Sequence, residues 1–270
     1  MKKLYRYNTI GDFFKDVSSA TDSKLFSGNE LSSQRLDDDK EPWHGTKTWE
    51  EANELLISGD AKSAEMIRTS GQIRTPKRTN VNRPIPTCNV YGYLPHIPNY
   101  VAGIPTDMIN HRSIVAKQKV ITIIVAGAVN WTWSAQKLAD VNAKVVTAIR
   151  MIEAGGVRCN LYSYYGAYEG KESVGALVKV KDSGRYLEIE KMAYAMVNPA
   201  FFRRHFFRFL ETRKELTDRV WLSTYGRPAR MGDCKEMLES EHVKWHFLCH
   251  IDELKDESPK DIKAMFERGN

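Results

Sequence analysis

The sequence predicts an α/β protein with a doubly wound core, and three consecutive segments carry that prediction. Residues 119–126 form a β-branched apolar run of strand length, and residues 157–165 form another. Between them, residues 134–154 repeat apolar side chains at helical spacing and end at two glycines. A strand, a helix and a strand in about 45 residues are typical of a βαβ unit, which requires a parallel sheet covered by helices.

The chain before this unit divides into two predicted regions. Residues 1–42 are predicted to be an N-terminal appendage that contains one short amphipathic helix at 9–17. Residues 43–110 are predicted to be a helical segment followed by a Pro-rich basic segment. Its helices are expected at 49–58, where Thr46 or Thr48 supplies the cap, and at 61–68.

The Pro-rich segment, residues 69–106, contains six prolines, which exclude a long helix or a central strand. We therefore expect no regular structure there. Its tyrosines, Tyr91, Tyr93 and Tyr100, indicate that the second half is ordered against another surface.

Residues 111–270 are predicted to be the α/β core domain. After the βαβ unit we expect a strand at 176–181, a helix at 187–196, an aromatic helix from Ala200 to about Leu216, a strand at 220–222, a helix at 234–240, a strand at 243–250 and a helix at 259–267. The alternation of strands and helices suits a doubly wound sheet.

The loop after the first strand of the unit is where α/β proteins usually place ligands. It contains neither GxGxxG nor GxxxxGK[ST], so neither nucleotide-binding fingerprint is present. The topology resembles that of a von Willebrand factor A-like domain, in which the first strand ends in Asp-x-Ser-x-Ser and holds a divalent cation. The matching positions carry Ala126, Ala128 and Asn130. Because a methyl group cannot ligate a hard cation, the resemblance implies a core that has lost its metal site.

Basic residues are concentrated in one stretch. From Met66 to Ala139 the chain has nine bases and one acid, Asp107, a difference of +8, while the whole chain carries +6. This asymmetry favours a polyanionic partner on one side of the molecule, although a solvated basic face without a partner is the alternative.

Single-stranded nucleic acid is held by cations along its backbone and by aromatic rings that stack on its bases. The residues expected to do so are Arg74, Lys77, Arg78, Arg83, Tyr91, Tyr93, Trp131, Trp133, Arg204 and Arg208. Two alternatives remain open. The tryptophans would instead pack against the N-terminal region, and the arginines of the aromatic helix would instead be buried and paired with acids.

No catalytic, metal or cofactor site is predicted. The chain has no nucleophile signature such as G-x-S-x-G and no paired carboxylates. His242, His246 and His250 recur every four residues, but in a strand they would spread over about 26 Å, too far for one metal. The four cysteines lack CxxC spacing and are expected to be reduced thiols of a cytoplasmic protein without a signal peptide or a membrane span.

Three blocks of the sequence resemble a group of bacteriophage proteins. They are Trp43-His44-Gly45 with Trp49-Glu50-Glu51-Ala52 and Ser58-Gly59-Asp60, the stretch Val90–Pro105, and Pro199-Ala200-Phe201-Phe202-Arg203-Arg204 with Phe207. In size and charge the chain is also similar to the single-stranded-DNA-binding protein with which schitoviruses recruit their RNA polymerase to promoters. The resemblance implies a non-catalytic phage protein that binds single-stranded DNA and recruits a phage RNA polymerase. The alternative is a protein-interaction or assembly module on the metal-free von Willebrand A-like fold.

Overall fold

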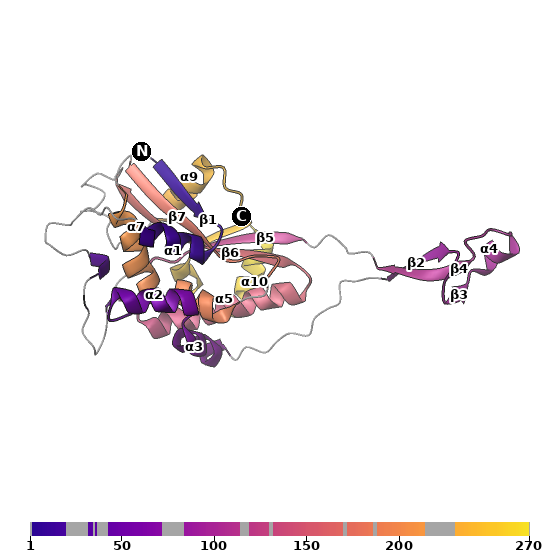
Figure 1. Cartoon of the computed structure of the whole chain (residues 1–270), viewed down its shortest axis with the longest axis horizontal. Coiled ribbons are helices and arrows are strands. Elements are labelled where there is room, and N and C mark those ends of the chain that lie inside the picture. Colours follow the sequence, from indigo (N-terminus) through magenta and orange to yellow (C-terminus); the bar gives the residue numbers. More distant parts are fainter. Residues whose placement is uncertain are drawn as a thin grey trace.

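The two strands predicted at 119–126 and 157–165 pair in parallel in the computed structural model of the protein. The structure describes residues 2–19, 32–34, 36, 43–71, 84–113, 119–129, 132–169, 172–185, 188–213 and 230–269. Within these ranges it shows an α/β body and a smaller sheet that projects from it (Figure 1). The predicted α/β class is confirmed.

The central sheet of the described body has the strand order β1-β7-β6-β5-β8. Its strands are β1 (Lys2–Tyr7), β5 (Val120–Ala126), β6 (Arg158–Glu169), β7 (Glu172–Lys181) and β8 (Phe247–His250). The pairs β1–β7, β5–β6 and β5–β8 are parallel, whereas β6 and β7 form an antiparallel hairpin. Parallel pairs require crossover connections, and helices supply them here.

Successive residues of β5 point into two different cores, one on each face of the sheet. Ile123 faces the larger core, together with helix α5 (Ala135–Ala154). Ile124 faces a smaller core that includes Leu238 of helix α9 (Met231–Ser240). Helices therefore cover both faces, which is why β5 is apolar along almost its whole length.

Most helices begin and end close to where their capping residues predict. Thr48 accepts a hydrogen bond from the backbone of Glu51, Ser134 caps α5, and Ser258 forms a capping box. Three helices pack beside α5, namely α3 (Ala61–Gly71), α6 (Ile189–Met196) and α10 (Pro259–Arg268). Helix α2 (Trp49–Ser58) packs beside α6, as α3 also does. The strand predicted at 243–250 begins only at Phe247 and is followed by a short turn, η3 (Ile251–Leu254).

Residues 2–19 belong to the body, although the sequence predicted 1–42 as a separate appendage. Strand β1 forms the edge of the central sheet beside β7, and helix α1 (Ile10–Ser19) buries Phe13 and Val17 in the same core as that strand. The pairing was missed because the partner strand lies far along the chain and three basic residues interrupt the apolar pattern of β1.

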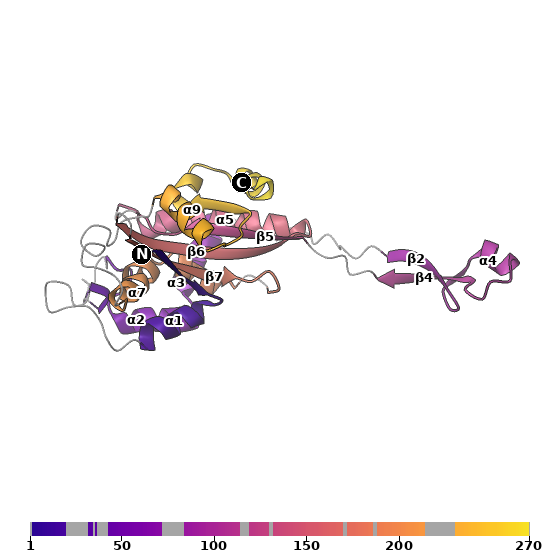
Figure 2. The ribbon, with the colours of Figure 1, turned by 90° about the horizontal axis from the view of Figure 1, so that it is seen from above.

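The Pro-rich segment contains a small sheet, contrary to the prediction that it lacks regular structure. Strands β2 (Pro84–Asn89), β3 (Leu94–Pro95) and β4 (Met108–Ser113) are antiparallel in the order β2-β4-β3, and a short helix α4 (Ile97–Val101) joins β3 to β4. Pro84, Pro86 and Pro95 fit because they lie on the two edge strands, and Pro98 fits in the first turn of α4. Figures 1 and 2 show this unit, residues 84–113, standing away from the body; we call it the arm.

The aromatic helix predicted from Ala200 begins as a π-helix. The π-type turns span η2 (Phe201–Phe206) and continue into α7 (Phe207–Glu211). Every residue of both elements is buried, and another short turn, η1 (Ser32–Gln34), lies against them. No sequence pattern distinguishes a π-helix from an α-helix. The strand predicted at 220–222 lies outside the described residues.

None of the helices in the described ranges has the length and the apolar character that a membrane crossing requires.

Candidate binding surfaces

The arm exposes a cluster of large apolar side chains. They are Val90, Tyr91, Tyr93, Leu94, Ile97, Tyr100, Val101 and Ile104. Val101 is 79% exposed and Tyr100 is 67% exposed, and no described side chain of the arm is buried. Exposed apolar side chains of this size are typical of interaction sites, so the arm is a candidate binding surface.

Backbone and polar contacts inside the arm hold this cluster in place. The side chain of Asn99 donates to the carbonyl of Thr106 at 2.7 Å, and the backbone of His96 donates to Asp107 at 2.6 Å. Gly92 packs directly on the backbone of Ile109, where a side chain would have no room. These contacts stabilise the arm, and its large apolar side chains remain exposed to solvent.

Both edges of the arm sheet carry proline. Pro86 lies on β2 opposite His111, and Pro95 lies on β3 opposite Met108. Because proline has no N–H, neither edge offers a continuous ladder to an added strand. The addition of a strand at either edge is therefore disfavoured.

The arm itself carries little charge, because Asp107 and Arg112 are its one acid and its one lysine or arginine. The predicted cations Arg74, Lys77, Arg78 and Arg83 precede the arm and lie outside the described residues. Among the other bases of the +8 window, Arg68 is paired with Glu65 and Glu190, and Lys137 lies 4.2 Å from the ring centre of Trp133. The described part of the window is thus partly neutralised by the protein's own groups.

Only two of the predicted nucleic-acid-binding residues that the structure describes are at the surface. Tyr91 is 66% exposed and Tyr93 is 60% exposed, and both lie on the arm. Trp131 lies outside the described residues. Trp133 is buried in the larger core, with α3 and α5 nearby, so it forms no open platform for a base.

Arg204 and Arg208 do not extend an exposed basic face. Arg204 is fully buried and Arg208 nearly so, because the π-helix and α7 lie inside the body. Arg208 approaches Glu211 at 4.0 Å. The burial predicted by the alternative is therefore confirmed, and so is an acid beside Arg208, whereas Arg204 donates to a hydroxyl and to backbone carbonyls. The signal for burial was that the five phenylalanines of this helix exceed one face.

Arg204 is the centre of a buried polar cluster that the sequence did not reveal. Its guanidinium donates to the hydroxyl of Thr46 at 2.7 Å and to the carbonyls of Thr46, Ser33 and Lys47 at 2.7, 3.0 and 3.0 Å. Glu211 accepts from the backbone N–H of Ser33 at 3.0 Å and from its hydroxyl. Two segments of the N-terminal third are thereby fastened to the aromatic helix, and we call this cluster the arginine clasp.

A neutral histidine lies beside the clasp. Nδ1 of His205 lies 2.9 Å from the hydroxyl of Tyr194, and Nε2 lies 3.1 Å from Oδ1 of Asn53. Complete burial, with Arg204 nearby, lowers the pKa of His205 to about 3. The neutral ring has one N–H donor and one nitrogen acceptor for these contacts.

The loop after β5 offers no metal site in its described part. Ala126 and Ala128 are buried there, and Asn130 lies outside the described residues. No group of three or more potential ligands gathers anywhere in the described ranges. Burial raises the pKa of Cys159 and Cys234 to about 12, so neither thiol is activated.

Comparison with known protein families assigns residues 2–270 to one family. Neither the curated proteins nor the solved structures give a significant match to the chain. A protein family does match residues 2–270, and its description is a domain of unknown function, DUF7192. Because the match covers almost the entire sequence, the chain belongs to the DUF7192 family.

Proposed function

We propose that this is a non-catalytic binding protein whose arm docks into an apolar groove of another protein. The observation that carries the proposal is the exposed cluster on residues 84–113. Five of its eight members, among them Val101 and Ile97, are aliphatic. Aliphatic side chains gain free energy from an apolar partner surface, whereas they contribute no stacking to a nucleic-acid base.

The apolar side chains of α4 are also arranged so that they could insert together into a groove. Ile97 and Val101 are four residues apart on α4, so they lie on the same side of that helix. The neighbouring Tyr100 adds an aromatic ring, a residue type that is enriched at the energetic centres of interfaces. With few charges on the arm, the complementary surface is expected to be apolar and uncharged.

The proposal can be tested by photocrosslinking in the cells that produce the protein. A photoreactive phenylalanine analogue replaces Tyr100 in the full chain, and a matched variant carries it at Val120, an exposed apolar residue at the start of β5. We expect position 100 to form one discrete protein adduct that resists nuclease and disappears when Ile97→Ser and Val101→Ser are added. Equal labelling at position 120, or an adduct that nuclease removes, contradicts the proposal. An adduct with a second copy of the chain would contradict docking into another protein and would show that the arm mediates self-association.

A second candidate is binding of single-stranded nucleic acid, followed by recruitment of a phage RNA polymerase as the resemblance implies. Three exposed tyrosines, Tyr91, Tyr93 and Tyr100, favour it, because they lie next to the basic stretch of the sequence. In this case oligonucleotide affinity falls with rising salt by about 0.7 log units per log unit of salt for each phosphate contact. A flat salt dependence, or no binding at low salt, excludes this candidate.

For the core we propose a von Willebrand A-like domain that has lost its cation site. Two features support it. Strand β5 has a parallel neighbour on each side, and its carboxyl end carries Ala126 and Ala128 at the positions where that family has ligands. A domain of this kind would act as the rigid base from which the arm reaches its partner.

A further inference from the structure

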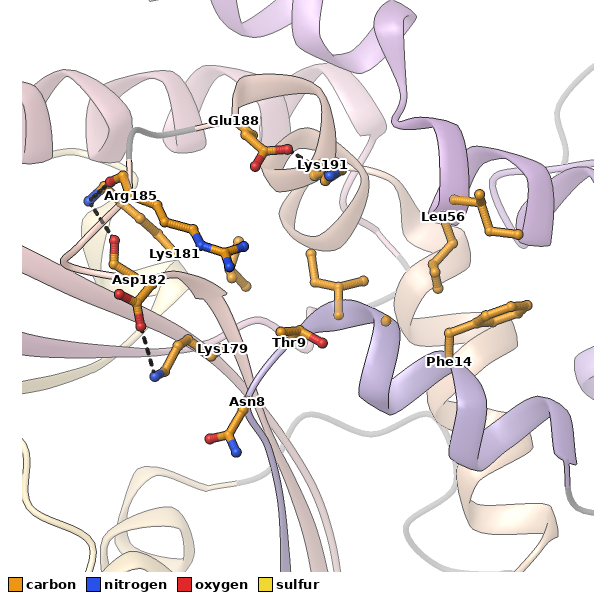
Figure 3. A pocket seen from close by; sticks show the side chains of 14 residues that line it. Asn8, Thr9, Phe14, Leu56, Lys179, Lys181, Asp182, Arg185, Glu188 and Lys191 are labelled. Atoms are coloured by element: carbon orange, nitrogen blue, oxygen red, sulfur yellow. Dashed lines mark hydrogen bonds and ion pairs between the residues drawn. The ribbon is translucent and has the colours of Figure 1, made fainter.

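A cavity of about 380 Å³ opens on the body where two parallel strands end (Figure 3). The residues that follow β1 and β7, namely Asn8 and Asp182, line the same opening. In α/β sheets, ligands bind at the carboxyl ends of the strands. The volume is that of a site for a small organic molecule.

Basic side chains outnumber acidic ones around this cavity. The bases are Lys179, Lys181, Arg185 and Lys191, and the acids are Asp182 and Glu188. Three of the bases are matched by carboxylates. Lys179 donates to Asp182 at 3.1 Å, Lys191 lies 2.7 Å from Glu188, and the buried Lys181 lies 2.6 Å from Glu153.

Arg185 is the base that remains. Figure 3 shows its guanidinium extending over the cavity, and no carboxylate of the described residues lies within ion-pair distance of it. Its backbone is fixed at the base of the loop, because its N–H donates to the carbonyl of Asp182 at 3.1 Å and its carbonyl accepts from Lys181 at 3.3 Å. The exposed guanidinium is therefore available to an anion from solution.

The opposite side of the cavity is the first turn of α1, which offers backbone donors. Thr9 already caps the N–H of Asp12 at 3.0 Å. The N–H groups of Ile10 and Gly11 have no acceptor among the described residues, as expected for a first helical turn. A Cβ on Gly11 would meet only the hydroxyl of Thr9, at 3.6 Å, so no bulky side chain shields this backbone.

The third wall of the cavity is apolar. Phe14 of α1 and Leu56 of α2 contribute to it (Figure 3). Ile57 of α2 also lines the cavity. A ligand that fills the whole cavity therefore needs an anionic group at one end and an apolar or aromatic group at the other.

We propose that this cavity binds a small organic phosphate. The phosphate lies between Arg185 and the first turn of α1, and the organic group lies against Phe14 and Leu56. Donors on two opposite sides suit the three terminal oxygens of a phosphate better than the two oxygens of a planar carboxylate, and arginine binds phosphate through two parallel hydrogen bonds. The proposal does not depend on what the arm binds.

Calorimetric titration of the full chain with three probes tests it. Phenyl phosphate should bind most tightly, inorganic phosphate more weakly because it lacks the ring, and benzoate most weakly. Arg185→Gln should weaken phenyl phosphate binding at least about tenfold, the effect of losing one charge-assisted pair. The matched change Arg268→Gln, at an exposed position of α10, should leave it unchanged.

Three results would overturn the proposal. The first is no binding of phenyl phosphate at about 10 mM, which would mean a binding free energy weaker than about 3 kcal/mol. The second is equal binding of phenyl phosphate by the Arg185→Gln protein. The third is tighter binding of benzoate than of phenyl phosphate. Because Arg185 is exposed, its substitution should leave the circular dichroism spectrum unchanged. The arm variant with Ile97→Ser and Val101→Ser should bind phenyl phosphate as the unmodified chain does, so failure of one proposal is distinguishable from failure of the other.

Discussion

Arg204 donates to both the hydroxyl and the backbone carbonyl of Thr46, each at 2.7 Å, inside the body of the protein. This pair joins two of the three sequence blocks singled out above. Thr46 lies within the first block, between Gly45 and Trp49, and the arginine belongs to the third. The second block, by contrast, forms the exposed part of the arm. The first and third blocks thus build the base, and the second presents the exposed surface.

We expect Arg204→Met to destabilise the body strongly. The substitution keeps most of the side-chain volume but leaves the carbonyls of Ser33, Thr46 and Lys47 without their donor in a buried site. The expected loss of unfolding free energy is about 3 kcal/mol or more, measured by urea denaturation. Arg268→Met at an exposed position should cost less than about 0.5 kcal/mol. Equal stabilities of the two variants would mean that the clasp does not hold the N-terminal segments.

We expect Gly45→Ala to destabilise the same junction by a different route. Gly45 has φ +84°, and a Cβ there would lie 2.9 Å from the backbone nitrogen of Ala200 and 2.9 Å from Cδ of Pro199. Backbone strain and these close contacts together should lower the free energy of unfolding, measured by heat or urea, by about 2 kcal/mol or more. Gly232→Ala in α9, where nothing lies within 4 Å, should instead stabilise by about 0.5–1 kcal/mol.

Local signals explain what the sequence predicted correctly. The βαβ unit follows from adjacent apolar runs, and the helices at 49–58 and 134–154 follow from Thr48 and Ser134, each acting within three residues of itself. Strand β1 and the arm sheet were missed because their pairing depends on distant partners and on edge positions that tolerate proline.

The candidate surfaces were only partly within reach of the sequence. Tyr91, Tyr93 and Tyr100 predicted a segment ordered against another surface, but all three are exposed on the arm. Base stacking by Tyr91 and Tyr93 stays a prediction. Arg204 was chosen for its charge, but an arginine on a helix that is apolar all round lies inside, where carbonyls replace the expected phosphates. The cavity beside Arg185 was missed because its walls come from α1, α2 and β7, which are distant in sequence.

Acid should destabilise the protein through His205. Its pKa is about 3 in the folded state, lowered by burial, and about 6.5 in the unfolded chain. The unfolded state therefore binds the extra proton between these values. The stabilisation is complete above about pH 6.5 and is lost as the pH falls toward 3, by up to about 1.4 kcal/mol per pH unit. In His205→Gln the unfolding free energy, measured by urea titration at each pH, should fall less steeply between pH 6.5 and 4 than in the unmodified protein. Identical slopes would show that the imidazole titrates freely in the folded protein.

Backbone amides of the arm should exchange with solvent far faster than those of the central sheet. Strands β2 and β4 are paired with each other, but a small sheet without a buried core is marginally stable, so its hydrogen bonds open without global unfolding. Strands β5 and β6 lie between two cores, and their amides should open only when the body unfolds. Hydrogen–deuterium exchange with mass spectrometry compares the two sheets in one sample, and β5–β6 serves as the internal control. Binding of the proposed partner should slow exchange at 90–104 and leave β5 and β6 unchanged, because apolar burial at the tip orders the arm alone. Protection of the arm equal to that of β5 in the isolated protein would mean that its apolar face is already covered.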